Sequence, residues 1–232
     1  MNTRTQHVPD SDIRGVRPAD QERSVILQQK FVAAARAMLL DARLADIPIP
    51  VLARKAKSSV GGFYSRFESK EALLDFMRMQ MLHENKNLFD DHLNAARFAG
   101  KSHHDVSAAF VDFMLQVYSS PWRGVIREAY LALRERPETW EPIRQRSQLW
   151  CERVIGFCAP LVARRDGLEE RVAVAVQLLF SALNNEMMNP HLAFGIKDPK
   201  FRLYLVLSFD TLIAGQFEKA LSDSLDRARC QP

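Results

Sequence analysis

The sequence predicts an all-α protein with a small N-terminal head and a larger C-terminal helical domain. Apolar residues recur three and four positions apart over most of the chain, which is the spacing of amphipathic helices. The chain has nine glycines and few Val/Thr alternations, which argues against a sheet. Its 232 residues, 47% of them apolar and 26% charged, are enough to bury a sizeable core.

The first elements form the head, which we define as residues 21–70. Residues 1–20 mix Pro, Asp, Arg, Ser and Gly without periodicity and are expected to be a disordered tail. The apolar positions from Ser24 to Leu40 predict the first helix. A connector over 41–48 follows, and Pro50 suits the first turn of a second, short helix.

The stretch from Leu52 to Lys70 predicts a helix-turn-helix. A third helix over about 60–66 begins after two serines, either of which can cap it, and Ser69 can cap the helix that follows. Two short helices joined by a tight turn form a motif whose second helix enters the major groove of DNA. Gly61 and Gly62 on that helix would let the backbone approach the duplex closely.

The same stretch resembles the signature of TetR-family transcriptional regulators. The matching residues are Ala56–Tyr64 (AKSSVGGFY), Phe67, Ser69–Glu71 (SKE) and Leu73. The resemblance covers residues 24–75. This chain departs from the family at Lys57, where glycine is common, and at Pro48–Val51, where the family tends to have a Thr-x-x-Glu capping box. Lys57 is expected to fit if the turn avoids positive φ.

Positive charge is concentrated in this region. Arg23–Lys70 carries nine basic and three acidic side chains, a net charge of +6, whereas the whole chain has +4. A solvated helix face is the alternative explanation, but a phosphate-facing surface needs such a concentration. The resemblance implies contacts from Tyr64 and Lys70, and charge and helical placement add Lys57 and Arg66. The predicted DNA-binding residues are Lys55, Lys57, Ser59, Val60, Gly61, Gly62, Phe63, Tyr64, Arg66 and Lys70.

The C-terminal domain, residues 71–232, is expected to be helical throughout and to provide effector binding and dimerisation. A long helix over 71–98 would join the head to the rest. Further helices are predicted over 106–118, 121–134, 140–162 and 168–188, and a last one from Asp198-Pro199.

Two of these segments, Val172–Leu183 and Phe201–Ile213, are apolar on nearly every side. A helix of that kind must be buried on every side. A second copy of the chain would supply the cover by forming a four-helix bundle, although a core pair within one subunit is the alternative. The predicted interface residues are Val176, Leu179, Phe180, Leu183, Leu205, Phe209 and Leu212.

Aromatic and methionine side chains of the middle helices could line a cavity for a small apolar ligand. From the residues alone a packed core is the simpler interpretation, whereas the TetR resemblance implies an inducer cavity in this region. The predicted lining residues are Met77, Phe110, Phe113, Met114, Tyr118, Trp122 and Trp150.

Patterns for catalysis, cofactors and metals are missing from the sequence. The six histidines lack metal-ligand spacing, the three cysteines form no CxxC, and there is no GxSxG, P-loop or GxGxxG. We therefore expect no enzyme activity, no cofactor and no metal. No apolar run reaches the roughly 18 residues of a membrane span and no secretory signal is visible, so a cytoplasmic protein is expected.

With the resemblance, these patterns predict a homodimeric DNA-binding regulator, a repressor that a small apolar ligand releases from a palindromic operator in double-stranded DNA. One alternative is a regulator that binds DNA constitutively and has no effector. Another is a helical enzyme or interaction protein in which the helix-turn-helix is incidental.

Overall fold

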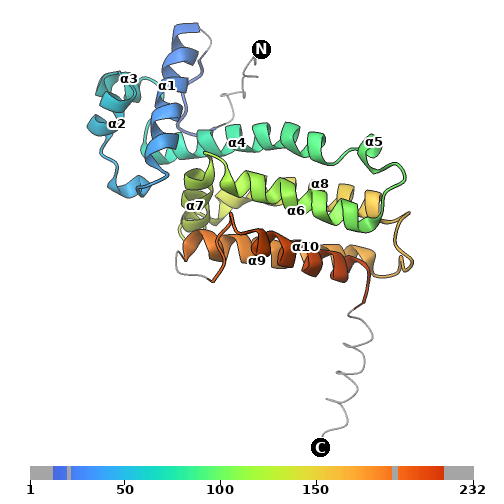
Figure 1. Ribbon diagram of the computed structural model, residues 1–232. Helices are drawn as coiled ribbons and strands as arrows, with labels where there is room; N and C mark the ends of the chain where they lie inside the picture. The colour runs from blue at the N-terminus through green and yellow to red at the C-terminus, as the bar shows by residue number, and fades with distance from the viewer. Residues whose placement is uncertain (1–12, 20–21, 190–192, 217–232) are drawn as a thin grey trace, which may run out of the picture. The chain divides into compact units, whose positions relative to one another are not determined.

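The computed structural model describes residues 13–19, 22–189 and 193–216, and the regular elements within these ranges are all helical (Figure 1). The all-α prediction is confirmed. The α-helices are α1 (Glu22–Met38), α2 (Ile49–Lys55), α3 (Val60–Tyr64), α4 (Lys70–His92), α5 (Ala95–Phe98), α6 (His103–Ser119), α7 (Arg123–Ala132), α8 (Glu141–Cys158), α9 (Leu168–Met188) and α10 (Pro199–Ile213). Two 3₁₀ turns are η2 (Leu44–Asp46) and η3 (Pro137–Trp140). In the described ranges, no helix has the length and hydropathy needed to cross a bilayer.

The elements group into two compact units. The first unit comprises Met1–Lys86 and Ser119–Ile143, and the second comprises Asn87–Tyr118 and Arg144–Pro232. The first unit therefore holds α7, η3 and the first part of α4 in addition to the head, whereas the sequence suggested a division near residue 70.

The core of the first unit is built around phenylalanines. Phe31 of α1 meets Phe63 of α3 edge to face, with ring centroids 5.4 Å apart. Phe67 packs on both Phe63 and Phe76 of α4. All four side chains are buried, and burying each contributes about 1.5–3 kcal/mol. The inward face of α3 thus holds the helix in place although it has only 5 residues.

In the same unit, α7 packs closely against the end of α1. A Cβ atom on Gly124 would lie 2.2 Å from the carbonyl oxygen of Leu39, so only glycine fits this approach. The Arg127 guanidinium donates to the same oxygen at 2.8 Å. Glu128, which is buried, accepts a hydrogen bond from Arg43 Nε at 2.8 Å. These contacts join α7 to the head.

The core of the second unit is an aromatic cluster, which we define as Phe89, Phe110, Phe113, Trp150 and Phe209. Phe89 stacks on Trp150 with centroids 5.7 Å apart, and Phe113 meets both rings edge to face. Phe110 packs between Phe113 and Phe209. All five side chains are buried.

Helices α9 and α10 pack along each other in the second unit (Figure 1). The start of α10 is the one predicted: the Asp198 side chain accepts a hydrogen bond from the Lys200 amide at 2.8 Å, and Pro199 occupies the first turn. At the other end, the buried Arg171 of α9 donates to the carbonyl of Ile213 at 3.2 Å. The guanidinium therefore satisfies a carbonyl that the end of α10 leaves open.

Candidate nucleic-acid interface

The turn between α2 and α3 is a Schellman motif with a lysine in its left-handed position. The Ser58 amide donates to Ala53 at 2.9 Å and the Lys57 amide to Arg54 at 3.0 Å, the two bonds that define this helix end. Lys57 has a φ of 51°, the only positive φ at a non-glycine in the described ranges. The turn therefore does not avoid positive φ, which was the condition under which Lys57 was expected to fit. Glycine is favoured at such a position because it lacks a Cβ.

The two glycines of α3 have different roles. The Ser59 hydroxyl caps the helix by accepting a hydrogen bond from the Gly62 amide at 2.9 Å. A Cβ on Gly62 would lie 2.6 Å from Ser58 Oγ, so glycine lets the serine hydroxyls lie close to the first turn. A Cβ on Gly61 would meet only Ser59 Oγ, at 3.9 Å. Gly62 thus serves the cap, whereas Gly61 leaves the outer face of α3 bare.

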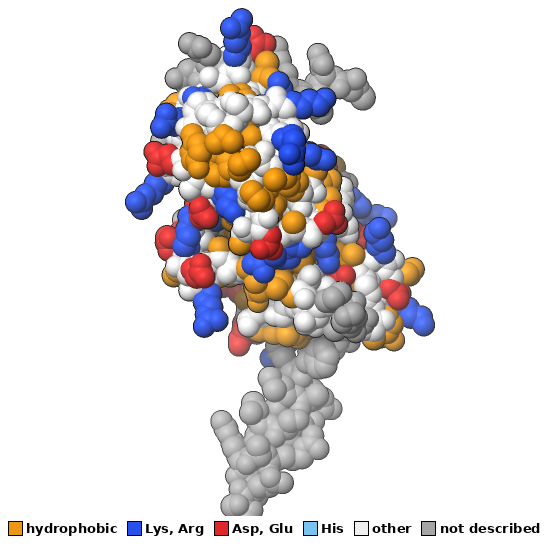
Figure 2. Space-filling view, turned by 90° about the vertical axis from the view of Figure 1, so that its left-hand side faces the viewer, with side chains coloured by type: hydrophobic (Ala, Val, Ile, Leu, Met, Phe, Trp, Pro, Cys, Tyr) orange, Lys and Arg blue, Asp and Glu red, His pale blue; other side chains and the backbone are white. Residues whose placement is uncertain are grey.

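That outer face is uncharged. Val60 is 38% exposed and Tyr64, one turn later, is 46% exposed, with the exposed Gly61 beside them. Phe63, which was predicted to bind DNA, is fully buried and belongs to the core. On the side of the molecule where Figure 1 shows α2 and α3, hydrophobic side chains gather on the upper part of the surface, with lysines and arginines around them (Figure 2). We call Val60, Gly61 and Tyr64 the α3 face.

The Lys70 ammonium group is engaged by the backbone of the head. Its Nζ donates to the carbonyl oxygens of Leu44, Ala45 and Ile47 at 2.8, 2.9 and 3.1 Å. An ammonium group has three donors, so these bonds use all of them. Lys70 therefore ties η2 to the start of α4.

Residues 13–19 run along the junction between α3 and α4. Val16 forms an antiparallel bridge with Phe67 and is buried. The Arg17 amide donates to the Arg66 carbonyl at 2.9 Å. The expectation of a disordered tail does not hold for this segment, because a strand-like pairing is a long-range contact that local composition does not reveal. Residues 1–12 and 20, the rest of the expected tail, lie outside the described ranges.

The same segment holds the side chain of Arg66. Its Nη1 donates to the carbonyl of Pro18 at 3.1 Å, and its Nε donates to the carbonyl of Ser65 at 2.6 Å. The guanidinium thus lies against the N-terminal segment rather than on the α3 face.

Three lysines surround a shallow pocket of about 310 Å³ beside the turn. They are Lys30 of α1, Lys55 at the end of α2 and Lys57 of the turn. Lys55 and Lys57 were among the predicted DNA-binding residues, whereas Lys30 was not. Lys30 contributes to the basic charge of Arg23–Lys70, and this was the one sign in the sequence that it could belong to the interface. No local pattern places the middle of α1 beside the turn.

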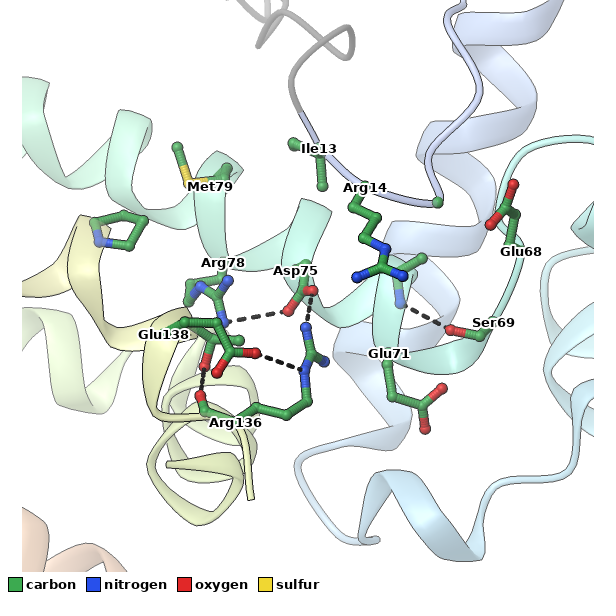
Figure 3. Close-up of a pocket in the computed structure, with 14 residues that line it drawn as sticks. Ile13, Arg14, Glu68, Ser69, Glu71, Asp75, Arg78, Met79, Arg136 and Glu138 are labelled. Carbon is green, nitrogen blue, oxygen red and sulfur yellow. Dashed lines mark hydrogen bonds and ion pairs between the residues drawn. The ribbon is translucent and has the colours of Figure 1, made fainter. Parts of the chain in front are cut away.

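The first unit has a second cavity, of about 880 Å³. It is lined by residues 13–15, by the first turns of α4 and by η3 (Figure 3). Arg78 and Arg136 both point toward Asp75 there. Arg78 is 5% exposed, and burial lowers the pKa of its guanidinium while the nearby Asp75 carboxylate raises it. Because the walls carry both signs of charge, the cavity does not select for a cation or an anion.

The residues predicted to line a ligand cavity are all buried, and they divide between the units. In the second unit, three of them belong to the aromatic cluster and pack on one another, and the Tyr118 hydroxyl donates to Asn184 Oδ1 at 2.8 Å. In the first unit, Met77 is fully buried and Trp122 Nε1 donates to Glu84 Oε2 at 2.7 Å. These side chains make core contacts in both units.

The predicted dimer residues lie mostly on the inward side of α9 and α10. Val176, Leu179, Leu183 and Phe209 are buried within the chain, and Phe180, Leu205 and Leu212 are half-buried. The large apolar side chains that the two helices leave exposed are Val174, Leu178, Leu203, Tyr204 and Leu207, each between 40% and 55% exposed. We call these five the α9/α10 face. The sequence could not separate the two sides, because both are apolar.

The described ranges contain no group of three His, Cys, Asp or Glu side chains that could hold a metal ion. His103 and His104 both bond through Nδ1 to the Asp210 carboxylate, at 2.8 and 3.1 Å. Cys158 is fully buried, and burial, with a smaller effect from Asp210, raises the pKa of its thiol to about 12. The thiol is therefore neutral near pH 7 and is not a reactive nucleophile.

The helices are arranged as in solved TetR-family transcriptional regulators. One from Rhodococcus sp. aligns with a TM-score of 0.62 at 11% identity and covers 81% of this chain and 98% of its own. One from Mesorhizobium loti aligns with a TM-score of 0.63 at 14% identity and covers 84% and 98%. The sequence matches no protein-family model and no curated protein. At these identities the similarity establishes a shared fold.

Proposed function

We propose that this chain, which has the fold of TetR-family regulators, is a DNA-binding transcriptional repressor that acts as a homodimer on a palindromic operator. The α3 face supports the proposal most directly: a short, capped helix presents Val60, Gly61 and Tyr64 to solvent, within a stretch (Arg23–Lys70) of net charge +6. A helix held by its inward face and bare on its outer face suits insertion into a major groove.

The side chains around α3 divide into base and phosphate contacts. Val60, which is exposed, would meet a thymine methyl group, and the missing side chain of Gly61 would let the backbone approach base edges. Lys55, Lys57, Ser59 and Tyr64 contact phosphates, which position the head without reading sequence. Lys70 and Arg66 act indirectly, because their hydrogen bonds hold η2 and the N-terminal segment in place.

Dimerisation through the α9/α10 face supplies the two-fold symmetry of the operator. Five large, exposed apolar side chains on two adjacent helices form the kind of patch that marks an interface. Pairing two copies gives a four-helix bundle, and a specific interface of this kind buries roughly 800 Å² on each partner. The buried residues Val176, Leu179, Leu183 and Phe209 support this face from within.

We further propose that a small apolar effector releases the dimer from DNA. A ligand shifts the dimer away from DNA only to the extent that it binds the DNA-free geometry more tightly. The aromatic cluster favours a second candidate, a regulator that binds DNA constitutively, because the rings that would line the cavity already pack on one another. A ligand that raises the melting temperature and lowers DNA affinity would identify the first candidate.

Selection of genomic fragments by the purified protein, followed by sequencing, tests the core of this proposal. Recovered fragments should share a palindrome, and Val60→Asp should weaken binding to them at least tenfold while leaving the melting temperature within a few degrees. Leu149→Asp is the matched control, since Leu149 is 50% exposed on α8 and belongs to the second unit. Recovery of no common sequence, or equal binding by Val60→Asp, would remove DNA recognition by α3.

A further inference from the structure

The pocket between α1 and the turn has the chemistry of an oxyanion site. Its lining consists of Lys30, Lys55 and Lys57 together with Ala33, Ala34 and Ala56, and no acidic side chain belongs to it. The three lysines are exposed, and the alanines leave the floor unobstructed. Three ammonium groups around one depression repel one another in the free protein, and a bound anion would remove that repulsion.

The left-handed backbone conformation of Lys57 is a second observation that points to this pocket. Lys57 takes the left-handed position of a Schellman motif with a φ of 51°, where glycine would be unstrained. Strain of this kind is typical of positions where a side chain serves a function. The side chain that this strained position retains is a cation, and it lines the same pocket as Lys30 and Lys55.

We propose that Lys30, Lys55 and Lys57 together form a cradle for a single backbone phosphate of DNA, next to the groove that α3 enters. The inference rests on the proposed function and adds Lys30, from outside the helix-turn-helix, to the interface. Lysine binds phosphate as a point charge without fixed geometry, so three of them on separate elements can converge on one group. The cradle sets the position of the head on the duplex and reads no sequence.

The salt dependence of binding to a labelled 24-bp duplex of arbitrary sequence tests the cradle, because each neutralised phosphate contributes about −0.9 to the slope of log K against log salt. For the triple variant Lys30→Gln/Lys55→Gln/Lys57→Asn we expect a slope less steep by about 1.8, since each of the two heads of the dimer loses one phosphate contact. Asparagine keeps the left-handed turn accessible. Each single variant should weaken binding several-fold, and the triple variant should lose less than the product of the three. Lys101→Gln, at an exposed position of the second unit, should match the wild type.

Other results would contradict the proposed cradle, and each would indicate a different alternative. A slope less steep by about 5.4 would mean three separate phosphate contacts on each head, and an unchanged slope would mean none. If inorganic phosphate raises the melting temperature of the wild type but not of the triple variant, while both bind DNA equally, the site takes a free anion instead. A wild-type protein that binds no duplex at any salt concentration would contradict the proposed function itself, so the two failures can be told apart.

Discussion

At the residue scale, Lys57 is a lysine in a backbone conformation that costs free energy for any residue with a Cβ. The Schellman motif needs a residue at positive φ, and a left-handed conformation costs a residue with a Cβ roughly 1–2 kcal/mol. Glycine avoids this cost but loses more conformational entropy on folding. The balance of the two effects sets the expected size of a substitution.

Lys57→Gly should therefore stabilise the protein by about 0.5–1 kcal/mol, because the relief of strain outweighs the entropy of glycine. The expected rise in melting temperature is about 1–4 °C for a chain of this size. Lys55→Gly is the matched control: its position is the last residue of α2, and a glycine there should destabilise by up to about 1 kcal/mol. A Lys57→Gly variant that melts below the wild type would show that the turn is not strained.

Gly61→Ala should lower DNA affinity without lowering the stability of the protein. Alanine has the higher helix propensity and would find open space, so stability should stay the same or rise by up to about 1 kcal/mol. DNA affinity should fall, because the added methyl group lies on the α3 face. In Gly62→Ala the new Cβ would instead displace the Ser58 hydroxyl, so any gain in stability should be smaller than in Gly61→Ala. Unchanged DNA affinity in Gly61→Ala would mean that the backbone of α3 does not approach the duplex.

Single residues also show where prediction from sequence stops. A serine cap at the start of α3 and the position of Phe63 and Phe67 on one side follow from spacing, but the choice of Ser59 over Ser58 and the burial of Phe63 do not. The engagement of Lys70 does not, because its three carbonyl partners belong to a turn more than twenty residues earlier. The position of Lys30 beside the turn is hidden for the same reason.

At the scale of elements, helices with local start and stop signals could be predicted closely. The last helix begins at Pro199 as expected, and α3 begins at Val60. The long helix predicted over 71–98 breaks after His92, because the Asn94 side chain caps a separate short helix by accepting from the Arg97 amide at 3.0 Å. Asparagine can serve as a cap inside an otherwise helical pattern, so spacing alone does not locate the break.

The packing of α7 on α1 could not be predicted, because Leu39 and Gly124 are far apart in the chain. Gly124→Ala places a Cβ 2.2 Å from a backbone carbonyl, and we expect a destabilisation of about 1–3 kcal/mol. Gly156→Ala is the matched control, since a Cβ there meets nothing within 4 Å and should stabilise α8 by about 0.5–1 kcal/mol. Chemical denaturation measures both. Equal stability of the two variants would contradict the close approach of α7 to α1.

At the scale of the whole molecule, the sequence could predict that α9 and α10 carry more apolar surface than one chain hides, but not which side remains exposed. Both sides are apolar, so the spacing of the apolar residues does not indicate which side of each helix faces solvent. Leu178 on α9 and Leu203, Tyr204 and Leu207 on α10 now define the outward side.

The double variant Leu178→Glu/Leu207→Glu should give a monomer at micromolar concentration, because pairing two copies would bury four like charges. Light scattering gives the mass, and DNA affinity should fall with it, since two heads no longer bind together. Leu149→Glu, at an equally exposed leucine of α8, is the control and should keep the mass of the wild type. A double variant that stays dimeric would place the interface elsewhere.

The central claim is that two copies of the α3 face are presented to the major groove by one symmetric dimer. Hydroxyl-radical footprinting on a selected genomic fragment tests it most directly, with Val60→Asp beside the wild type. We expect two protected patches related by two-fold symmetry, with centres one helical turn (about 34–36 Å) or a multiple of it apart, and the loss of both in Val60→Asp. A single asymmetric patch, or protection that Val60→Asp leaves intact, would contradict it.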